Sequence, residues 1–456
     1  MLCGKPEMGE MTMAIRRIAL ALLLCTLAAT PAAAEPLSLQ ASVARALAEN
    51  PQLKAYALGV GEAREDVRGA WGDFLPTLGL SYGKNKLIND SAAERDADYL
   101  NQRSNSSTVT LSQPLFSGFS GVAGVKRSNL GLEYQELQLR AIQAQVIREI
   151  HRDFYGVLQA QALLDLWEAA IKRLERQKEI ANAWYERQLA TRLRLLEVEV
   201  ELSSAIQQRD AARSSLAAAR ARMAHWLALP TPDELVLDGS LEQDGEASFP
   251  PLADCLEIAS RERPDLGMAA INIGVAEQEK VQVAARSLPR VDLEGSWTDY
   301  TRDYENIHYR DDQRDYYSVA LRVSFQPFQG GKNIFAWRRQ GLTVEKMRQQ
   351  QLETAKAIDT EVRSAFSQWQ DSAARLAASA DTLRQATDAW KFAERALELG
   401  VGSLRDLLDA ELRRTRAEIT RLDALQYRQR TRTDLAYAMG RNRNQADDGE
   451  GEVGRK

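Results

Sequence analysis

The residues able to do chemistry are few, and their spacing does not resemble an enzyme site. The sequence holds three His and three Cys. His151, His225 and His308 stand far apart, with no spacing suited to a shared metal ion. Cys255 is the one Cys beyond residue 34, and we interpret it as a small buried hydrophobe. The sequence therefore predicts no catalytic site, no metal site and no cofactor.

One local acidic cluster stands out. Asp406 and Asp409 follow Arg405, just after the glycine-containing segment 400–403. Position alone favours a plain structural role, because an Asp in the first turn stabilises the helix dipole and solvated helix faces are commonly charged. Any role in binding or ion selection depends on the elements that position this pair.

The composition excludes some classes of protein and indicates long helices. Lys and Arg number 59 against 64 Asp and Glu, so the chain lacks the basic excess of a nucleic-acid binder. A soluble chain of 456 residues would suggest about three domains. However, the stretches 157–229, 342–399 and 403–439 contain neither Gly nor Pro, which favours helices of unusual length.

The first 34 residues have the pattern of a secretory signal peptide. Arg16 and Arg17 precede the apolar run 18–27, and the small residues 32–34 follow. The run is shorter than the ~20 residues of a transmembrane anchor, which is the alternative. Cys25 follows three Leu, so lipidation there is a weaker alternative. We expect export and cleavage after residue 34.

The remaining chain contains an internal repeat, in which one sequence unit occurs twice in tandem. Three dipeptides recur at one constant offset: Asn50-Pro51 as Arg263-Pro264, Leu75-Pro76 as Leu288-Pro289, and Gln113-Pro114 as Gln326-Pro327. We predict a first repeat at 35–240, a linker at 241–250, a second repeat at 251–440 and a disordered tail at 441–456.

Each repeat is expected to contain two strands between helices. In the fourth strand Tyr317, Val319 and Leu321 alternate with polar or small residues, so one face is apolar and the other polar. A soluble antiparallel sheet is the alternative, but strands of about 10 residues also suit a tilted membrane strand. The polar segments 84–104 and 302–314 are predicted to be the connecting loops.

Four strands in one chain leave two open edges, which lipid does not tolerate. The smallest natural membrane barrels have about 8 strands. Three copies of the chain would give a closed barrel of about 12 strands.

Glycine and proline are predicted to mark the change from strand to helix. Pro114 and Gly118 follow the second strand, and Pro327 and Gly330 follow the fourth. The flanking residues do not match a phosphate-binding loop, so these glycines predict no nucleotide site. The helix that follows, from residue 118 to about 185, would span roughly 100 Å. Its apolar spacing suits coiled-coil packing, and a soluble periplasmic coiled-coil scaffold is the alternative function.

The mature chain resembles the TolC family of outer-membrane channel proteins. The segment 113–118 reads Gln-Pro-Leu-Phe-Ser-Gly, and 400–411 reads Gly-Val-Gly-Ser-Leu-Arg-Asp-Leu-Leu-Asp-Ala-Glu. The resemblance implies an α+β membrane protein that forms a homotrimer. Four transmembrane strands per protomer would build a 12-stranded barrel, continuous with a long periplasmic barrel of coiled-coil helices.

The resemblance also implies a function and its partners. Family members are outer-membrane exit ducts of tripartite efflux pumps or type I secretion systems, and they catalyse nothing. We therefore expect contacts with outer-membrane lipid, a periplasmic adaptor protein and an inner-membrane ABC or proton-driven transporter. No nucleic-acid partner is expected. The predicted location is the outer membrane, with the helices extending into the periplasm.

Asp406 and Asp409 match the family's paired acidic positions at the pore constriction, with Arg405 beside them. In a trimer they would form rings of carboxylates, which favour cations and bind multivalent cations. Gly400, Gly402 and Ser403 match the turn at the periplasmic tip. Two gate positions depart from the family, because Gly402 and Leu397 stand where an Arg and a Tyr are common. The closing contacts of this gate are therefore expected to differ.

Overall fold

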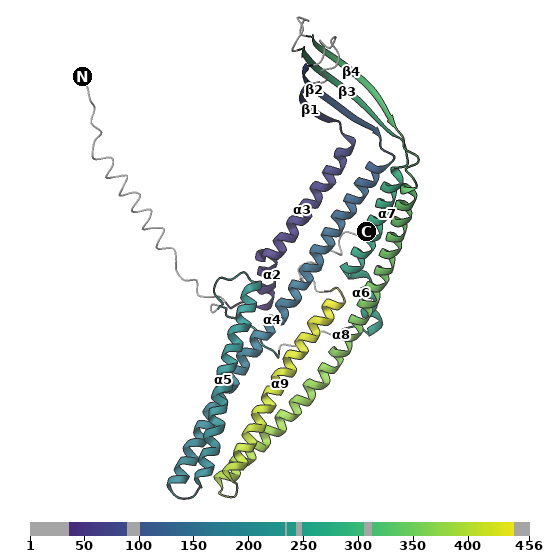
Figure 1. Ribbon diagram of the computed structural model, residues 1–456. Helices are drawn as coiled ribbons and strands as arrows, with labels where there is room; N and C mark the ends of the chain where they lie inside the picture. The colour runs from purple at the N-terminus through teal and green to yellow at the C-terminus, as the bar shows by residue number, and fades with distance from the viewer. Residues whose placement is uncertain (1–35, 89–100, 233–234, 243–248, 305–311, 442–456) are drawn as a thin grey trace, which may run out of the picture. The chain divides into compact units, whose positions relative to one another are not determined.

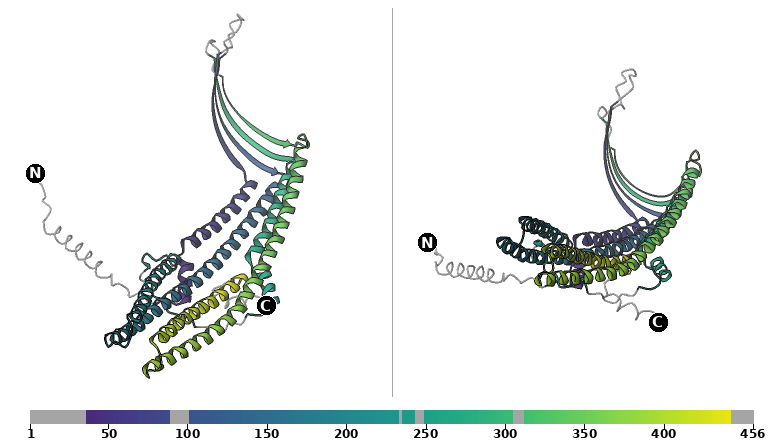
Figure 2. Two further views of the ribbon diagram at one scale, coloured as in Figure 1. Left: turned by 60° about the horizontal axis from the view of Figure 1, so that its bottom comes forward. Right: turned by 90° about the horizontal axis from the view of Figure 1, so that it is seen from below.

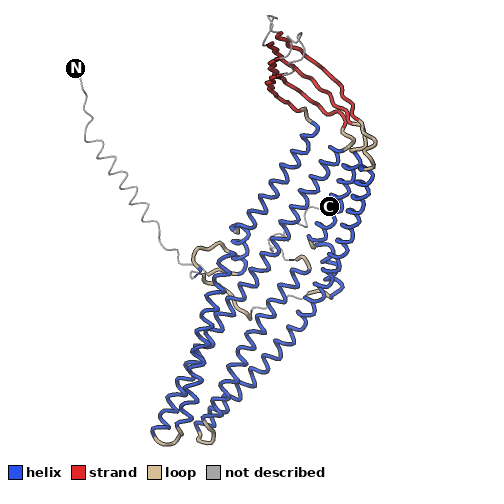
Figure 3. The backbone as a smooth tube through the Cα atoms, in the orientation of Figure 1, coloured by secondary structure: helices blue, strands red, loops and turns tan. Residues whose placement is uncertain are grey.

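The computed structural model describes residues 36–88, 101–232, 235–242, 249–304 and 312–441 (Figure 1). The predicted signal peptide, the predicted tail from residue 442 onward, most of the predicted linker and His308 lie outside the described residues. The described residues form helices and one four-stranded sheet (Figure 3). Within this part of the chain, none of the helices combines enough length with enough apolar character to cross a membrane.

Apart from the short helix η1, the two halves of the chain fold into the same series of elements. The first comprises α2 (Leu39–Glu49), α3 (Pro51–Trp71), η1 (Gly72–Phe74), β1 (Thr77–Ile88), β2 (Asn101–Phe116), α4 (Ser120–Glu186) and α5 (Arg192–Trp226). The second comprises α6 (Leu252–Glu262), α7 (Pro264–Ala285), β3 (Arg290–Tyr304), β4 (Asp312–Ser324), α8 (Lys332–Glu398) and α9 (Leu404–Ala438). Helices α4 and α8 each have 67 residues, and α5 and α9 each have 35. The internal repeat is thus confirmed in three dimensions.

The recurring X-Pro dipeptide begins α3 and α7, where Pro is favoured because the first helical N–H needs no partner. In the first repeat Asn50 caps α3, and its Oδ1 accepts hydrogen bonds from the backbone N–H groups of Gln52 (2.8 Å) and Leu53 (3.4 Å). In the second repeat Arg263 replaces the cap. Its guanidinium pairs with Glu361 at 3.1 Å, so the same turn is held by an ion pair.

The sheet is antiparallel with the strand order β1-β2-β3-β4, and Figure 2 shows the strands side by side as one curved layer. The register places four large or branched side chains across one face, from Leu80 through Val109 and Trp297 to Tyr317. One residue further on, the opposite face carries hydroxyls, and the side chains of Thr108 and Thr298 hydrogen-bond at 3.2 Å. The predicted alternation of an apolar and a polar face is confirmed.

The apolar face of the sheet has no covering layer in the described chain. Val319 is 81% exposed, and Leu78, Leu80, Leu321 and Val323 are exposed as well. A soluble sheet would bury such a face against a core, because each large apolar side chain gains roughly 1.5–3 kcal/mol on burial. The exposed face therefore favours a sheet that lies in lipid.

The strands extend beyond their predicted ends. Residues 84–88 continue β1, residues 101–104 begin β2, and the described ends of β3 and β4 likewise enter the predicted loop 302–314. The loop boundaries predicted from polarity were therefore wrong by a few residues. Backbone pairing depends on the register and not on side-chain polarity, so a ladder can continue after the apolar alternation has ended.

The predicted strand-to-helix residues lie at the two connections. The ladder between β2 and β3 shifts register between Pro114 and Phe116, which ends the regular pairing. Gly118 has a φ of +62°, and a Cβ there would lie 2.8 Å from the backbone oxygen of Ala285. Pro327 follows β4, and Gly330 has a φ of +59°. Glycine is thus required at position 118 for two reasons, the left-handed backbone conformation and the close approach of the Ala285 backbone.

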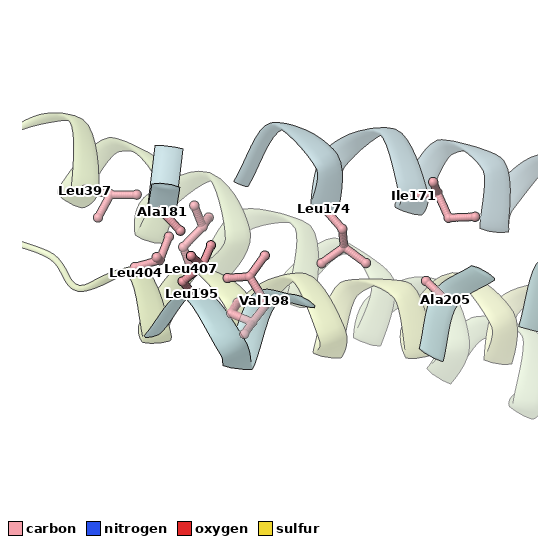
Figure 4. Close-up of a cluster of buried hydrophobic side chains, with 10 residues drawn as sticks. Ile171, Leu174, Ala181, Leu195, Val198, Ala205, Leu397, Leu404 and Leu407 are labelled. Carbon is pink, nitrogen blue, oxygen red and sulfur yellow. The ribbon is translucent and has the colours of Figure 1, made fainter. Parts of the chain in front are cut away.

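The helices bury two separate apolar clusters. One contains residues from α4, α5, α8 and α9 near the helix turns (Figure 4). The other lies among α6, α8 and α9 and includes Cys255, Val362, Leu435 and Met439. Burial raises the pKa of the Cys255 thiol, and its Sγ donates to the oxygen of Pro250 at 3.3 Å. The prediction of a buried, packing cysteine is confirmed.

Candidate functional site

The turn between α8 and α9 has the geometry of a Schellman cap. Gly400 has a φ of +75°, and its N–H donates to the oxygen of Leu397 at 3.1 Å. The N–H of Val401 donates to the oxygen of Ala396 at 3.0 Å. A Cβ on Gly402 would lie 2.9 Å from the Cβ of Ala396. Each of these two glycines therefore meets a separate steric demand of the turn.

The first repeat makes the same turn without glycine. Gln188 occupies the left-handed position with a φ of +59°, and its N–H donates to the oxygen of Tyr185 at 2.9 Å. The N–H of Leu189 donates to the oxygen of Trp184 at 2.8 Å. Ala190 takes the place of Gly402. The two turns are equivalent in backbone bonding, but a Cβ is accommodated at Ala190 and would be too close to Ala396 at Gly402.

Ser403 and Asp406 form a reciprocal cap at the start of α9. The N–H of Asp406 donates to Oγ of Ser403 at 3.2 Å, and the N–H of Ser403 donates to Oδ2 of Asp406 at 3.3 Å. The Ser403 hydroxyl also donates to Oδ2 at 2.6 Å. These hydrogen bonds, assisted by the charges of Arg405 and Arg194, hold the pKa of Asp406 below its ordinary value. The carboxylate is therefore ionised and fixed in orientation.

This cap gives Asp406 the helix-stabilising role that position alone predicts. The role does not remove the charge from the surface, because the side chain remains exposed. Asp409 and Arg405 are exposed too. In the part of the chain that the structure describes, the Asp409 carboxylate takes part in no hydrogen bond or ion pair. The acidic pair is thus available on one surface of α9.

The opposite side of α9 packs against the first repeat. Leu404 and Leu407 belong to a buried cluster that also contains Leu195 and Val198 of α5 and Leu174 of α4 (Figure 4). This contact fixes the rotation of α9 about its own axis, so the acidic pair is held on the side away from the core.

A partly buried ion-pair network lies next to this cluster, and it was not among the sites predicted from the sequence. Nε of Arg173 on α4 lies 2.5 Å from Oε1 of Glu411 on α9. Arg173 also approaches Glu418 at 3.6 Å, and Glu418 accepts a hydrogen bond from Arg414 at 3.0 Å. The Arg414 guanidinium lies over the ring of Trp390, 4.5 Å from its centroid. Glu411 closes the recognised 400–411 motif, which is the one signal that could have drawn attention to it.

The acidic pair has no counterpart in the first repeat. The equivalent positions hold Arg194 and Glu197, and their side chains form an ion pair at 2.7 Å. The paired negative charges are therefore a property of α9 alone.

Comparisons with known proteins agree with this architecture. The model of the family described as outer membrane efflux protein matches residues 43–228 and 255–441, which is one match for each repeat. The alkaline protease secretion protein AprF of Pseudomonas aeruginosa is 27% identical over 383 residues, covering 80% of this chain and 76% of AprF.

Solved structures of outer-membrane channels show the same fold. The Campylobacter jejuni CmeC channel has a TM-score of 0.76 at 14% identity, covering 90% of this chain and 88% of that one. The open-state Neisseria gonorrhoeae MtrE channel has a TM-score of 0.73 at 20% identity and covers 88% of each chain. The repeats, the sheet and the paired matches lead to one conclusion: the chain belongs to the outer membrane efflux protein family, has a TolC-like fold and is an outer-membrane exit duct of an efflux or secretion system.

Proposed function

We propose that the protein is a homotrimeric exit duct whose three sheets close into one barrel. The single observation that carries this proposal is the pair of open edges on a sheet with an exposed apolar face. Strands β1 and β4 each have one neighbour in the described chain, so each leaves a row of backbone N–H and C=O groups unpaired. Pairing β4 of one copy with β1 of the next would satisfy both edges and give 12 strands.

The helices beside the two sheet edges support the same arrangement. Leu58 and Trp71 on α3 are exposed, as are Phe335 and Leu342 on α8, with Leu342 at 73%. These residues lie on the helices that continue from the edge strands. Contact between α8 of one copy and α3 of the next would bury them, which is the expected use of a large exposed apolar patch.

The channel itself would be passive. Asp406, Asp409 and Arg405 would surround the narrowest point, next to the tip turn of Gly400, Gly402 and Ser403. Binding of a periplasmic adaptor at the tip would move α8 and α9 outward and widen this opening. An inner-membrane transporter would supply the energy, and residues 1–34 would direct export of the chain. N-terminal sequencing of the mature protein should then begin at Glu35.

Protein secretion is the cargo class that the comparisons favour. The relative with 27% identity over most of the chain is named for secretion of a protease. Structural likeness at 14–20% identity shows only the fold.

The test is a deletion strain and its complemented control. Loss of one or a few proteins from the culture medium, with drug susceptibility unchanged, would support secretion. Normal secretion combined with hypersensitivity to small toxic compounds would reject it in favour of efflux. Trimer formation is tested separately, as a heat-sensitive trimer band on gels of the outer-membrane fraction.

A further inference from the structure

We propose that Arg413 and Arg416 form a basic collar directly behind the acidic pair, and that the two together set the ionic selectivity of the pore. The inference rests on the proposed function, in which Asp406 and Asp409 line the constriction of a trimer. It adds two specificity-determining residues and a second ring of opposite charge.

The placement follows from helix geometry. Residues seven apart on a helix return to the same side within about 20° and lie about 10 Å apart along the axis. Arg413 is one heptad after Asp406, and Arg416 is one heptad after Asp409. All four side chains are exposed, whereas Glu411 on the opposite side of α9 is buried. If the acidic pair faces the pore, the two arginines face it as well.

Packing within the protomer does not account for these arginines. In the described residues, neither Arg413 nor Arg416 has a side-chain hydrogen bond or an ion pair. Their neighbour Arg414 differs, because it pairs with Glu418 at 3.0 Å and stacks on Trp390. Two guanidinium groups therefore remain on the exposed stripe.

The collar ends after one heptad. The next positions of the stripe hold Thr420 and Asp423. Asp423 is engaged within the protomer, where its Oδ1 accepts a hydrogen bond from Gln159 at 2.8 Å. Within the described residues, Asp409, Arg413 and Arg416 are thus the charged positions of this stripe without a side-chain partner, and Asp406 has only its cap with Ser403.

The order of charges is specific to the second repeat. The first repeat holds Arg194 and Glu197 at the acidic positions, and Glu201 and Ser204 at the positions of the two arginines. A general preference of this fold for charged residues would give similar pairs in both halves. The acid-then-base order instead occurs on the helix that carries the candidate constriction.

Two rings of opposite charge in series act on small ions in opposite directions. Their separation of about 10 Å is close to the Debye length of about 8 Å at physiological ionic strength, so each ring keeps a local effect. Cations are favoured at the acidic ring and opposed at the basic ring, and anions experience the reverse. The permeant that suits both rings carries charges of both signs along its length, as an extended polypeptide does.

Reversal potentials in planar bilayers under a salt gradient test the collar. The Arg413→Gln, Arg416→Gln variant should raise the cation-to-anion permeability ratio about threefold or more, since ring charges change the local potential by about one kT or more. The Asp406→Asn, Asp409→Asn variant should lower the ratio by a similar factor. Arg413→Lys with Arg416→Lys should match the wild type. Arg213→Gln, which removes an exposed arginine from α5, is the control and should change nothing.

A second measurement avoids variants that assemble poorly. Arg413→Cys can be modified in the open channel with a cationic or an anionic thiol reagent, because the one free cysteine in the described chain, Cys255, is buried. The cationic reagent should restore the wild-type ratio, and the anionic reagent should raise it further. Channels that conduct normally but show no change in ratio with any arginine variant or reagent would overturn the collar and leave the duct intact. Absence of any conductance from the wild-type trimer would overturn the proposed function, and the collar with it.

Discussion

Arg173 and Glu411 form a buried ion pair that joins the two repeats. The Arg173 side chain on α4 is 18% exposed, and the Glu411 side chain on α9 is 1% exposed. Thr415 adds a hydroxyl contact to the same carboxylate oxygen at 3.4 Å. Because α9 also carries the acidic pair, this contact couples the position of the candidate gate to the first repeat.

Removal of either partner should destabilise this region strongly. Arg173→Met leaves a buried carboxylate without a counter-charge, which typically costs about 3–5 kcal/mol. Thermal unfolding of the purified protein should show a large fall in melting temperature. The matched control is Arg384→Met, because Arg384 pairs with Asp381 on an exposed surface, where such pairs contribute about 0–1 kcal/mol.

The double variant Arg173→Met, Glu411→Met separates charge burial from packing. Replacing both members of a buried pair by apolar side chains is often neutral or stabilising. We therefore expect it to recover most of the stability that Arg173→Met loses. A double variant that is as unstable as the sum of the single ones would contradict the assigned pair.

The cap at Ser403 should set the acid sensitivity of the gate. The folded-state pKa of Asp406 is depressed, so its stabilising contribution is present above the ordinary carboxyl range and is lost as pH falls through the lowered value. Ser403→Ala removes the main cause, so the pKa of Asp406 should rise toward its ordinary value and the acid-dependent loss of stability should become smaller. Melting temperatures of the wild type, Ser403→Ala and Asp406→Asn across acidic pH measure this. Curves for Ser403→Ala and wild type that remain parallel would count against the cap.

The two tip turns can be compared by exchanging the residues at their left-handed positions, Gly400 and Gln188. Gly400→Gln places a side chain in the left-handed region and should destabilise the second hairpin by about 1–2 kcal/mol. Gln188→Gly relieves the same conformation in the first hairpin and should be neutral or stabilising. Unfolding measurements on both variants should therefore give opposite or clearly unequal shifts. Equal destabilisation would show that the two turns do not share the bonding described.

Local sequence signals were sufficient for much of the fold. The glycine-free and proline-free stretch 342–399 lies almost entirely in α8, and the alternation around Val319 predicted which face of β4 is apolar. The turn after α4 was harder to place, because Gln188 occupies its left-handed position without Gly or Pro as a signal. The predicted helix end at about residue 185 nevertheless agrees with the end of α4 at Glu186.

Contacts between residues far apart in the sequence could not be predicted from these local signals. Arg173 and Glu411 are 238 positions apart, and each looks like an ordinary charged helix residue in its own segment. Their pairing arises only when α4 and α9 pack together. The acidic pair could be predicted from its motif, whereas the reciprocal hydrogen bonds of Ser403 with Asp406 depend on the geometry of the turn between α8 and α9.

The central claim is that the protein is a conducting duct whose constriction carries Asp406 and Asp409. The most direct measurement is divalent-cation block of single channels in planar bilayers, comparing the wild type with Asp406→Ala, Asp409→Ala. Carboxylate rings bind multivalent cations, so the wild type should be blocked and the double variant should conduct with the block largely removed. An unchanged block in the double variant, or a wild-type protein that forms no channels, would contradict the account.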